Sequence, residues 1–280
     1  MYHKASIGKQ YRLNRIIDPK SGKTVIVPID DSLIYGPFEG LSNIPNKLKQ
    51  IVKGKPNAVL AFLGIFRNNS VLLKGISGIM NVTASTVNSF HTRKVLVGNV
   101  KQAVQMGMDA VAVHLNLTSK YEPEMLQNMG VISRECEEYG MPLMTIVYPR
   151  KETKGADENY EEMKIKNRKK YTSLVAHACR VGVDLGADIV KTQFTGDAET
   201  FLKVVEVCLP VPVVIAGGPL IEPIKMFHNA YEAVSAGGSG VSFGRNVFNR
   251  DNSTAFIKAL RQIVHNGLDP KAALKILNSK

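Results

Sequence analysis

Residues 187–216 read ADIVKTQFTGDAETFLKVVEVCLPVPVVIA. A short apolar run at residues 188–191 is followed by a helical pattern at 197–208 and by a second apolar run at 211–216. Asp197 suits the amino end of this helix, because its carboxylate can accept hydrogen bonds from the first backbone N–H groups. Apolar runs on both sides of one helix predict two parallel strands joined by a crossover, since strands covered on both faces are apolar throughout.

The same alternation of apolar runs and helical patterns extends along the rest of the chain. Residues 121–139 and 171–184 have apolar side chains at helical spacing, and Gly140 suits the end of the first of these helices. Six further apolar runs occur at residues 24–30, 58–63, 79–84, 110–115, 142–147 and 240–243. Eight strand–helix units predict an α/β fold, a (β/α)8 TIM barrel formed as a single domain by residues 1–280.

An open, doubly wound parallel sheet is the alternative fold. Such a sheet usually has a Gly-x-Gly-x-x-Gly turn after an early strand, and this sequence has none there. The third unit is ambiguous, because residues 93–98 resemble a strand as well as residues 79–84 do. We favour the barrel, with residues 1–22 as an amino-terminal extension.

Residues 150–170 interrupt the alternation after the fifth strand. They include eight Lys or Arg and five Asp or Glu residues but few apolar ones. This composition predicts a long, solvated loop, in part helical, on the rim where the active-site loops of a barrel lie. A charged surface loop without a catalytic role is the simpler interpretation of the same segment.

Composition limits the classes to which the protein can belong. The 280 residues have a mean hydropathy of −0.05, and no apolar run approaches the roughly 20 residues needed to cross a bilayer. The first residues lack the apolar stretch of a signal peptide, and Cys136, Cys179 and Cys208 lack Cys-x-x-Cys spacing. We therefore expect a cytoplasmic protein with reduced thiols, no zinc site and no membrane contact.

The net charge of +12 suits a phosphorylated or otherwise anionic small molecule. Nucleic acid is the alternative partner, but the basic residues are spread along the chain and no recognised nucleic-acid motif accompanies them. We therefore expect small-molecule partners and no nucleic acid.

Three polar residues at strand ends suggest imine chemistry. Lys191 closes an apolar strand, and burial there would lower the pKa of its amine and leave part of it free to attack a carbonyl. Asp30 ends the first strand and Tyr148 the fifth, so a carboxylate and a phenol would face the amine and could carry its protons. The alternatives are a lysine that reaches out to water, an aspartate that caps a helix and a tyrosine that only packs.

The glycine-rich turns after the last two strands predict a phosphate site. Gly217 and Gly218 would let backbone N–H groups approach an oxyanion, and Gly244 would do so beside the cation of Arg245. Barrels frequently bind phosphate at these two turns, although many glycines serve only tight turns. His114, near the end of the fourth strand, is either a substrate contact or a buried histidine with a fixed hydrogen-bond partner.

These residues lie within longer motifs of a known family. In chain order the motifs are Arg12-Leu-Asn-Arg, Lys23-Thr-Val-Ile-Val-Pro, Gly36-Pro-Phe-Glu-Gly-Leu, Met108-Asp-Ala-Val-Ala-Val-His-Leu-Asn, Gly140-Met-Pro-Leu, Tyr148-Pro-Arg, Leu185-Gly-Ala-Asp-Ile-Val-Lys-Thr, Thr195-Gly-Asp, Ala216-Gly-Gly-Pro and Gly244-Arg-Asn-Val-Phe. With this set the chain resembles the DhnA-type class I aldolases over nearly its whole length. Among their members, 2-amino-3,7-dideoxy-D-threo-hept-6-ulosonate synthase and archaeal-type fructose-bisphosphate aldolase are the most similar.

The resemblance implies a role for each residue of the predicted site. Lys191 would form the Schiff base, Tyr148 would be the acid and base, and Asp30 would be the carboxylate at the first strand. The substrate phosphate would be held by Gly217, Gly218, Gly244 and Arg245. The family also implies a homo-oligomer, often a decamer, that needs no cofactor and no metal.

Three departures from the family pattern concern the second substrate. Asp30-Asp31-Ser32 stands where the family commonly has Asp-His-Gly, residues 62–70 lack the histidines of the synthase pattern, and residues 150–170 are longer than usual. We expect all three to border the second substrate. The additional carboxylate of Asp31 would suit an aldehyde that carries an amine.

The sequence therefore predicts a class I aldolase or transaldolase that joins a phosphorylated ketone donor to an aldehyde. L-aspartate 4-semialdehyde is the acceptor that we expect. One alternative is reversible cleavage of fructose 1,6-bisphosphate. An alternative of another class is a barrel that binds phosphosugars without catalysis.

Overall fold

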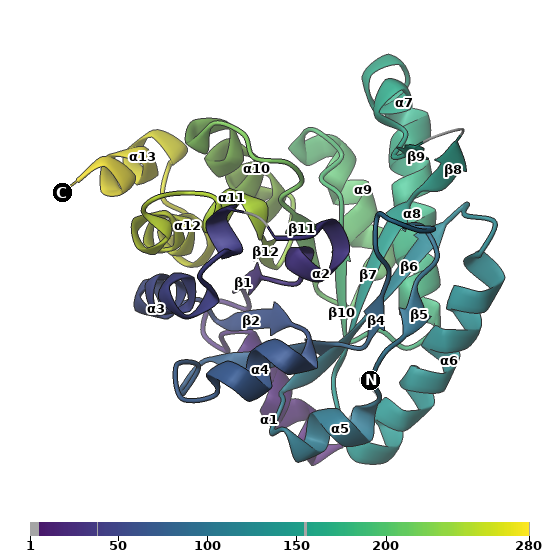
Figure 1. The fold of residues 1–280 in the computed structure, drawn as a ribbon. Coiled ribbons are helices and arrows are strands. Elements are labelled where there is room, and N and C mark those ends of the chain that lie inside the picture. The colour runs from purple at the N-terminus through teal and green to yellow at the C-terminus, as the bar shows by residue number, and fades with distance from the viewer. Residues whose placement is uncertain (1–5, 38, 154–155, 280) are drawn as a thin grey trace.

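Eight parallel strands close into a barrel in the computed structural model, which describes residues 6–37, 39–153 and 156–279 (Figure 1). The barrel strands are β1 (Thr24–Pro28), β2 (Ala58–Ala61), β3 (Ser77–Asn81), β6 (Ala110–Leu117), β7 (Leu143–Pro149), β10 (Ile189–Thr192), β11 (Val213–Ala216) and β12 (Gly240–Ser242). Each overlaps a predicted run, so the predicted (β/α)8 barrel is confirmed. The last strand pairs with the first through Thr24 and Gly240, which closes the ring.

Alternation along the strands separates two apolar cores. Val25 and Val27 of β1 pack against the surrounding helices, whereas Ile26 between them points into the barrel. The barrel interior is filled by Ile26, Ala58, Leu60, Ile79, Ala110, Ala112, Met144, Ile146, Ile189 and Val214, all buried. Most strand residues are therefore apolar on both faces of the sheet.

Helices cover the outside of the barrel (Figure 1). They are α3 (Ile44–Gly54), α4 (Leu63–Asn69), α5 (Val100–Gln105), α6 (Glu122–Tyr139), α8 (Arg168–Asp184), α9 (Ala198–Cys208), α10 (Pro223–Ser235), α12 (Ser253–Asn266) and α13 (Pro270–Asn278). Both predicted helix ends have the expected geometry. The Asp197 carboxylate accepts a 2.8 Å hydrogen bond from the Thr200 N–H, and Gly140 is left-handed with φ 57°.

Helix α1 (Ile7–Ile16) lies within the segment expected to be an amino-terminal extension, of which residues 1–5 fall outside the described residues. Its last residue, Ile16, is fully buried among the side chains that fill the barrel. The Ile16 carbonyl also accepts a 2.7 Å hydrogen bond from the Thr24 hydroxyl. Helix α1 thus covers the amino-terminal end of the barrel and leaves the carboxyl end open.

The third strand of the barrel is β3, which overlaps the predicted run 79–84 and not residues 93–98. Residues 93–98 contain only the short strand β5 (Val95–Leu96), which pairs antiparallel with β4 (Thr83–Ala84) outside the barrel. Part of the predicted run 79–84 therefore belongs to the barrel, and its last residues turn away from it. This excursion brings the irregular segment 85–93 to the barrel mouth.

The charged segment 150–170 has more regular structure than a solvated loop. It forms the hairpin β8 (Lys151–Thr153) and β9 (Ala156–Glu158) and the helix α7 (Glu161–Lys166), while residues 154–155 lie outside the described part. Figure 1 shows these elements at one edge of the barrel, and the short helix α2 (Asp31–Tyr35) near its centre. In the described ranges no helix has the length and apolar character to traverse a bilayer.

Candidate active site

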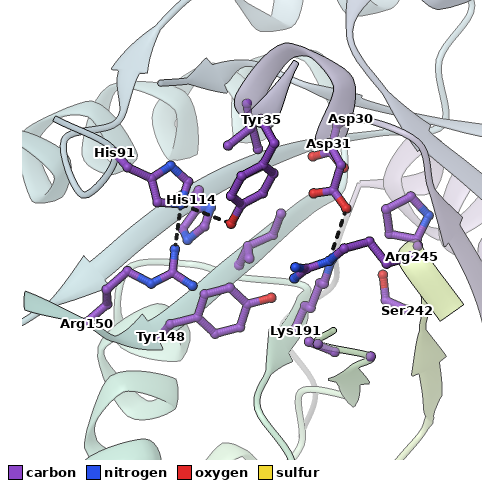
Figure 2. Close-up of a pocket in the computed structure, with 17 residues that line it drawn as sticks. Asp30, Asp31, Tyr35, His91, His114, Tyr148, Arg150, Lys191, Ser242 and Arg245 are labelled. Atoms are coloured by element: carbon purple, nitrogen blue, oxygen red, sulfur yellow. Dashed lines mark hydrogen bonds and ion pairs between the residues drawn. The ribbon is translucent and has the colours of Figure 1, made fainter. Parts of the chain in front are cut away.

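Side chains at the carboxyl ends of the barrel strands surround a pocket of about 570 Å³, including the part that opens to solvent. All residues that the sequence singled out line it: Asp30, Asp31, His114, Tyr148, Lys191, Gly217, Gly218, Gly244 and Arg245. Figure 2 shows the ionisable members of this set around a common space. The topology brings them together because parallel strands all end at the same rim.

Lys191 lies on the inner face of β10, beside Ile146 of β7 and Val214 of β11. Its side chain is 7% exposed, so it does not reach out to water. Burial lowers the pKa of the amine below its usual value, and the carboxylates of Asp30 and Asp31 oppose that shift. The amine is therefore easier to deprotonate than an exposed lysine, while anions close by can stabilise a cation at the same nitrogen.

Asp30 stands at the amino end of α2 but makes no capping hydrogen bond with its side chain. Instead, its Oδ2 accepts a 2.8 Å hydrogen bond from Asn81 Nδ2, at the end of β3. Asn81 is itself fixed, because its Oδ1 accepts a 3.1 Å bond from the Thr83 N–H. The carboxylate is thus held across the barrel mouth and does not serve the helix.

Tyr148 is 8% exposed, and burial raises the pKa of its phenol well above the usual value. The His114 ring meets it edge-on with 5.1 Å between centroids, and the Arg150 guanidinium lies 5.4 Å from its ring centre. The hydroxyl therefore stays protonated at neutral pH and can donate a proton to a reacting oxygen.

His114 is both a pocket residue and a histidine with a fixed partner. Its Nε2 lies 3.1 Å from Asn116 Oδ1, and Asn116 Nδ2 donates to the Thr92 carbonyl at 2.8 Å. Burial, followed by the charges of Lys94 and other cations, lowers the pKa of His114 well below its usual value. The ring is therefore neutral, and both interpretations of this residue describe part of its setting.

Hydrogen bonds link the two glycine-rich turns to each other. Asn246 follows Arg245 in the short helix α11 (Arg245–Phe248), and its Nδ2 donates to the carbonyls of Gly217 at 3.1 Å and Pro219 at 2.7 Å. A Cβ on Gly244 would lie 2.9 Å from the Pro28 carbonyl oxygen, so the turn after β12 needs glycine at this position. The backbone of both turns therefore stays close to the pocket.

Arg245 and Asp31 form an ion pair inside the pocket. Arg245 Nε lies 3.5 Å from Asp31 Oδ2, and the guanidinium lies 5.5 Å from the Tyr35 ring centre. Burial and the neighbouring charge of Asp30 raise the pKa of Asp31 to about 6, and Arg245 opposes this shift. A carboxylate thus faces the cation that was predicted to bind phosphate.

Sequence reasoning missed four polar pocket residues: Tyr35, His91, Arg150 and Ser242. Two of them had a signal, since Arg150 follows Tyr148 by the strand period of two and Ser242 ends β12. The Ser242 hydroxyl is buried and has no hydrogen-bond partner among the described residues. Tyr35 and His91 had no such signal, because they lie on connections without a regular period.

The surroundings of His91 contain a second buried lysine. Arg150 Nη1 donates to His91 Nε2 at 3.0 Å, and Lys94 Nζ donates to Ser85 Oγ at 2.6 Å. Burial, together with nearby cations, lowers the pKa of His91 to about 3 and that of Lys94 to about 7. On this side of the pocket, His91 is therefore neutral at neutral pH and Lys94 loses its proton more easily than an exposed lysine.

The expectation that residues 62–70 border the second substrate stays a prediction. These residues enter α4, and none of them lines the described pocket. Asp31 and Arg150 do line it. Among the residues that the structure describes, no group of three or more His, Cys, Asp or Glu side chains could hold a metal ion.

Comparison with known proteins identifies the family. The sequence profile of the DeoC/LacD family aldolases matches residues 24–250. The chain is 34% identical to 2-amino-3,7-dideoxy-D-threo-hept-6-ulosonate synthase 1 of Archaeoglobus fulgidus, over 94% of this chain and 93% of that one. It is 30% identical to 2-amino-4,5-dihydroxy-6-oxo-7-(phosphonooxy)heptanoate synthase of Streptomyces griseus, over 94% and 92% of the two chains.

Solved structures are similar in fold. An archaeal fructose 1,6-bisphosphate aldolase has a TM-score of 0.80 and 24% identity, over 92% of this chain and all of that one. A fructose-bisphosphate aldolase from Slackia heliotrinireducens has a TM-score of 0.83 and 19% identity, over 99% and 92% of the two chains. The profile and the sequence relatives together confirm the predicted resemblance. The chain belongs to the DeoC/LacD family of aldolases and is an aldolase-type enzyme.

Proposed function

We propose that Lys191 attacks the ketone of a phosphorylated donor and forms a Schiff base with it. The observation that carries this proposal is the buried amine of Lys191, with a lowered pKa, in one pocket with Asp30, Tyr148 and Arg245. A neutral amine adds to the ketone carbon, and loss of water from the carbinolamine leaves a protonated imine.

The protonated imine makes the carbon–carbon bond reaction possible because its nitrogen accepts electrons. Loss of a proton from the neighbouring donor carbon gives an enamine, which adds to the carbonyl carbon of an aldehyde. Water then releases the product and restores the amine of Lys191. Tyr148, which stays protonated, would give protons to the oxygens that leave or become hydroxyls, and the Asp30 carboxylate would accept them.

We propose that Gly217, Gly218, Gly244 and Arg245 bind the donor phosphate. Backbone N–H groups at the glycine turns and the forked cation of Arg245 suit this group. Asp31 then lies at the phosphate end, since it pairs with Arg245 at 3.5 Å. We therefore do not assign to Asp31 the amine of the acceptor, which was its expected contact. His114 would contact the part of the substrate that lies next to Tyr148, because the centres of the two rings are 5.1 Å apart.

We propose L-aspartate 4-semialdehyde as the acceptor. The name of the Streptomyces griseus relative describes a heptanoate with an amino group at carbon 2, hydroxyls at carbons 4 and 5, an oxo group at carbon 6 and a phosphonooxy group at carbon 7. Aldol cleavage of such a compound between carbons 4 and 5 gives a phosphorylated three-carbon ketone and a four-carbon amino-acid aldehyde. These are dihydroxyacetone phosphate and L-aspartate 4-semialdehyde.

Borohydride trapping tests the Schiff base directly. With dihydroxyacetone phosphate, reduction should add the mass of the reduced donor to the peptide that contains Lys191. Lys191→Met should remain folded by circular dichroism, gain no adduct and lose turnover. An adduct on a different lysine, or turnover retained by Lys191→Met, would refute the mechanism. A lack of any adduct across a panel of phosphorylated ketones would favour a barrel that only binds phosphosugars.

An acceptor panel separates the proposed substrate from the glycolytic alternative. The enzyme should join dihydroxyacetone phosphate to L-aspartate 4-semialdehyde with a higher kcat/KM than to glyceraldehyde 3-phosphate. The reverse preference would identify a fructose-bisphosphate aldolase.

We further propose that the chain acts as one domain within a cytoplasmic homo-oligomer, such as a decamer. Light scattering of the purified protein measures the number of subunits. A monomer at micromolar concentration would contradict the assembly.

A further inference from the structure

Arg150 is a pocket residue to which the proposed reaction gives no role. It follows Tyr148 by two residues, and its backbone N–H donates to the Leu117 carbonyl at 2.9 Å, just beyond the end of β7. Its guanidinium lies 5.4 Å from the Tyr148 ring centre and lines the pocket. The barrel wall, and not a free loop, therefore fixes the position of this cation.

The hydrogen-bond partners of the Arg150 guanidinium are uncharged. Its Nε donates to Asn159 Oδ1 at 2.6 Å, and its Nη1 donates to His91 Nε2 at 3.0 Å. Because arginine can only donate, His91 Nε2 is the ring nitrogen without a proton. Burial and the charges of Lys94 and Arg150 keep the pKa of His91 near 3, so the ring orients the guanidinium without adding or removing charge at neutral pH.

The charge of Arg150 is not compensated by a direct ion pair. Within the described ranges, no carboxylate lies within 4.0 Å of its guanidinium. The nearby Asp157 carboxylate lies 3.8 Å from His91 Nε2 and interacts with the charge of Arg150 from a longer distance. Arg245, in contrast, is paired directly with Asp31. A partly desolvated guanidinium that forms no direct ion pair favours binding of an anionic group from the substrate.

The two arginines lie at opposite ends of the pocket. Figure 2 shows Arg150 on one side of the Lys191 and Tyr148 side chains and Arg245 on the other. A donor joined to Lys191 with its phosphate at Arg245 would therefore add its new carbons toward Arg150. Tyr35 lies between the two, because its ring centre is 5.5 Å from the Arg245 guanidinium and its hydroxyl is 3.4 Å from His91 Nε2. His91 lines the Arg150 end, whereas all glycines of the described lining belong to the other end.

We propose that Arg150 binds the carboxylate of the acceptor aldehyde, an inference that rests on the proposed Schiff-base reaction. The planar fork of arginine presents two parallel N–H groups that match a carboxylate. The same fork also matches a phosphate, but the glycine turns that would add backbone N–H groups for a phosphate lie at the Arg245 end. Arg150 is thus a specificity residue that selects amino-acid or other acidic aldehydes.

Comparison of a charged and an uncharged acceptor tests the assignment. For Arg150→Gln, kcat/KM for L-aspartate 4-semialdehyde should fall about 10- to 100-fold, because a hydrogen-bonded charge pair is lost. The value for butanal, which has the same carbon count and no carboxylate, should stay close to that of the wild type. Arg150→Lys, which keeps the charge but not the fork, should give an intermediate ratio between the two aldehydes.

Arg180→Gln is the matched control, because Arg180 lies on the outer face of α8 and pairs with Asp184 at 2.8 Å. It should leave both aldehydes unaffected. Equal losses for butanal and the acidic aldehyde in Arg150→Gln and Arg150→Lys would overturn the proposal and assign Arg150 to the support of Tyr148. A greater loss for glyceraldehyde 3-phosphate than for the semialdehyde would overturn it in favour of a second phosphate site.

Trapping experiments distinguish this proposal from the reaction on which it rests. Borohydride with dihydroxyacetone phosphate should label Lys191 in the wild type and in Arg150→Gln alike. A wild type without label contradicts the Schiff-base mechanism itself. Normal labelling combined with an unchanged ratio between the two aldehydes contradicts only the carboxylate site.

Discussion

At the scale of single residues, Asp31 has the most distinctive setting, because its carboxylate faces the cation assigned to the donor phosphate. Asp31→Asn should strengthen inhibition by inorganic phosphate at pH 7.5, on the order of three- to tenfold, since a negative charge beside the phosphate is removed. The difference between variant and wild type should shrink toward pH 5, because Asp31, with a pKa of about 6, is then mostly protonated. Inhibition constants measured across this range provide the test.

The raised pKa of Asp31 also predicts how the stability of the folded protein depends on pH. The folded protein binds this proton more tightly than the unfolded chain does, whose carboxyl has a pKa near 3.8. The stabilisation is complete below about pH 3.8 and is lost as the pH rises through 6. The wild type should therefore lose stability over this range relative to Asp31→Asn in urea unfolding. Asp184→Asn, on the outer surface, is the control.

The positions of Lys191, Asp30 and Tyr148 could be predicted because each lies at or just beyond the end of a recognisable strand. Strand ends meet at one rim, so three distant residues in the sequence were expected to share a pocket. Their environment could not be predicted, since the Asn81 contact with Asp30 depends on a turn that leaves the barrel after β3. His91 lies on that same irregular connection and therefore had no periodic signal.

At the scale of elements, the hairpin β8–β9 depends on a single carboxylate. Glu152 accepts hydrogen bonds from the hydroxyls of Thr92 and Ser119 (2.6 Å for the latter), and from the Lys120 N–H at 3.1 Å. Burial alone would raise the pKa of Glu152, but these bonds lower it to about 2. The Glu152 carboxylate thus links the hairpin β8–β9 by hydrogen bonds to Thr92, the residue after His91.

Glu152→Gln should loosen this attachment, because an amide nitrogen cannot accept the bond from Lys120. We expect faster hydrogen exchange in residues 151–153 and 156–158 and a weaker preference for acidic acceptors, with helices elsewhere unchanged. The stabilisation by the carboxylate is present above about pH 4.5 and is lost as the pH falls toward 2. Glu158→Gln, in the same hairpin, is the control. Unchanged exchange in Glu152→Gln would contradict the role of this residue.

Long, regular helices and strands could be predicted from the sequence, whereas short elements could not. The helix at 197–208 was found from its spacing and from Asp197, both of which are local. The hairpin was not found, because strands of three residues have no measurable period and depend on Glu152 contacts with residues more than 30 positions away.

At the scale of the whole molecule, closure of the barrel depends on Gly240, where the last strand meets the first. Gly240 has φ 128°, and a Cβ there would lie 1.9 Å from the Thr24 carbonyl oxygen. Gly240→Ala should therefore lower the free energy of unfolding by roughly 2–5 kcal/mol, through backbone strain and overpacking. Urea unfolding followed by circular dichroism measures this loss.

Gly64→Ala is the matched control for barrel closure. Gly64 lies in α4, and a Cβ there would meet no atom within 4 Å. This substitution should raise the free energy of unfolding by about 0.4–1 kcal/mol, because it restricts the unfolded chain. A Gly240→Ala protein as stable as the wild type would show that the ring closes without this glycine.

The number of strand–helix units predicted the barrel, because eight such units form a closed ring more readily than an open sheet. What the sequence did not specify is the site where the ring closes. The contact between Gly240 and Thr24 joins residues that are 216 positions apart, and no local pattern describes it.

The hydroxyl of Ser242 is a buried group that lines the pocket and meets no polar protein atom among the described residues. A buried O–H contributes to binding when it donates to an oxygen atom, and a bound substrate can supply such an oxygen. Inhibitors with an acceptor atom directed at this hydroxyl should gain affinity that the same compounds would not obtain from a complete hydrogen-bond network.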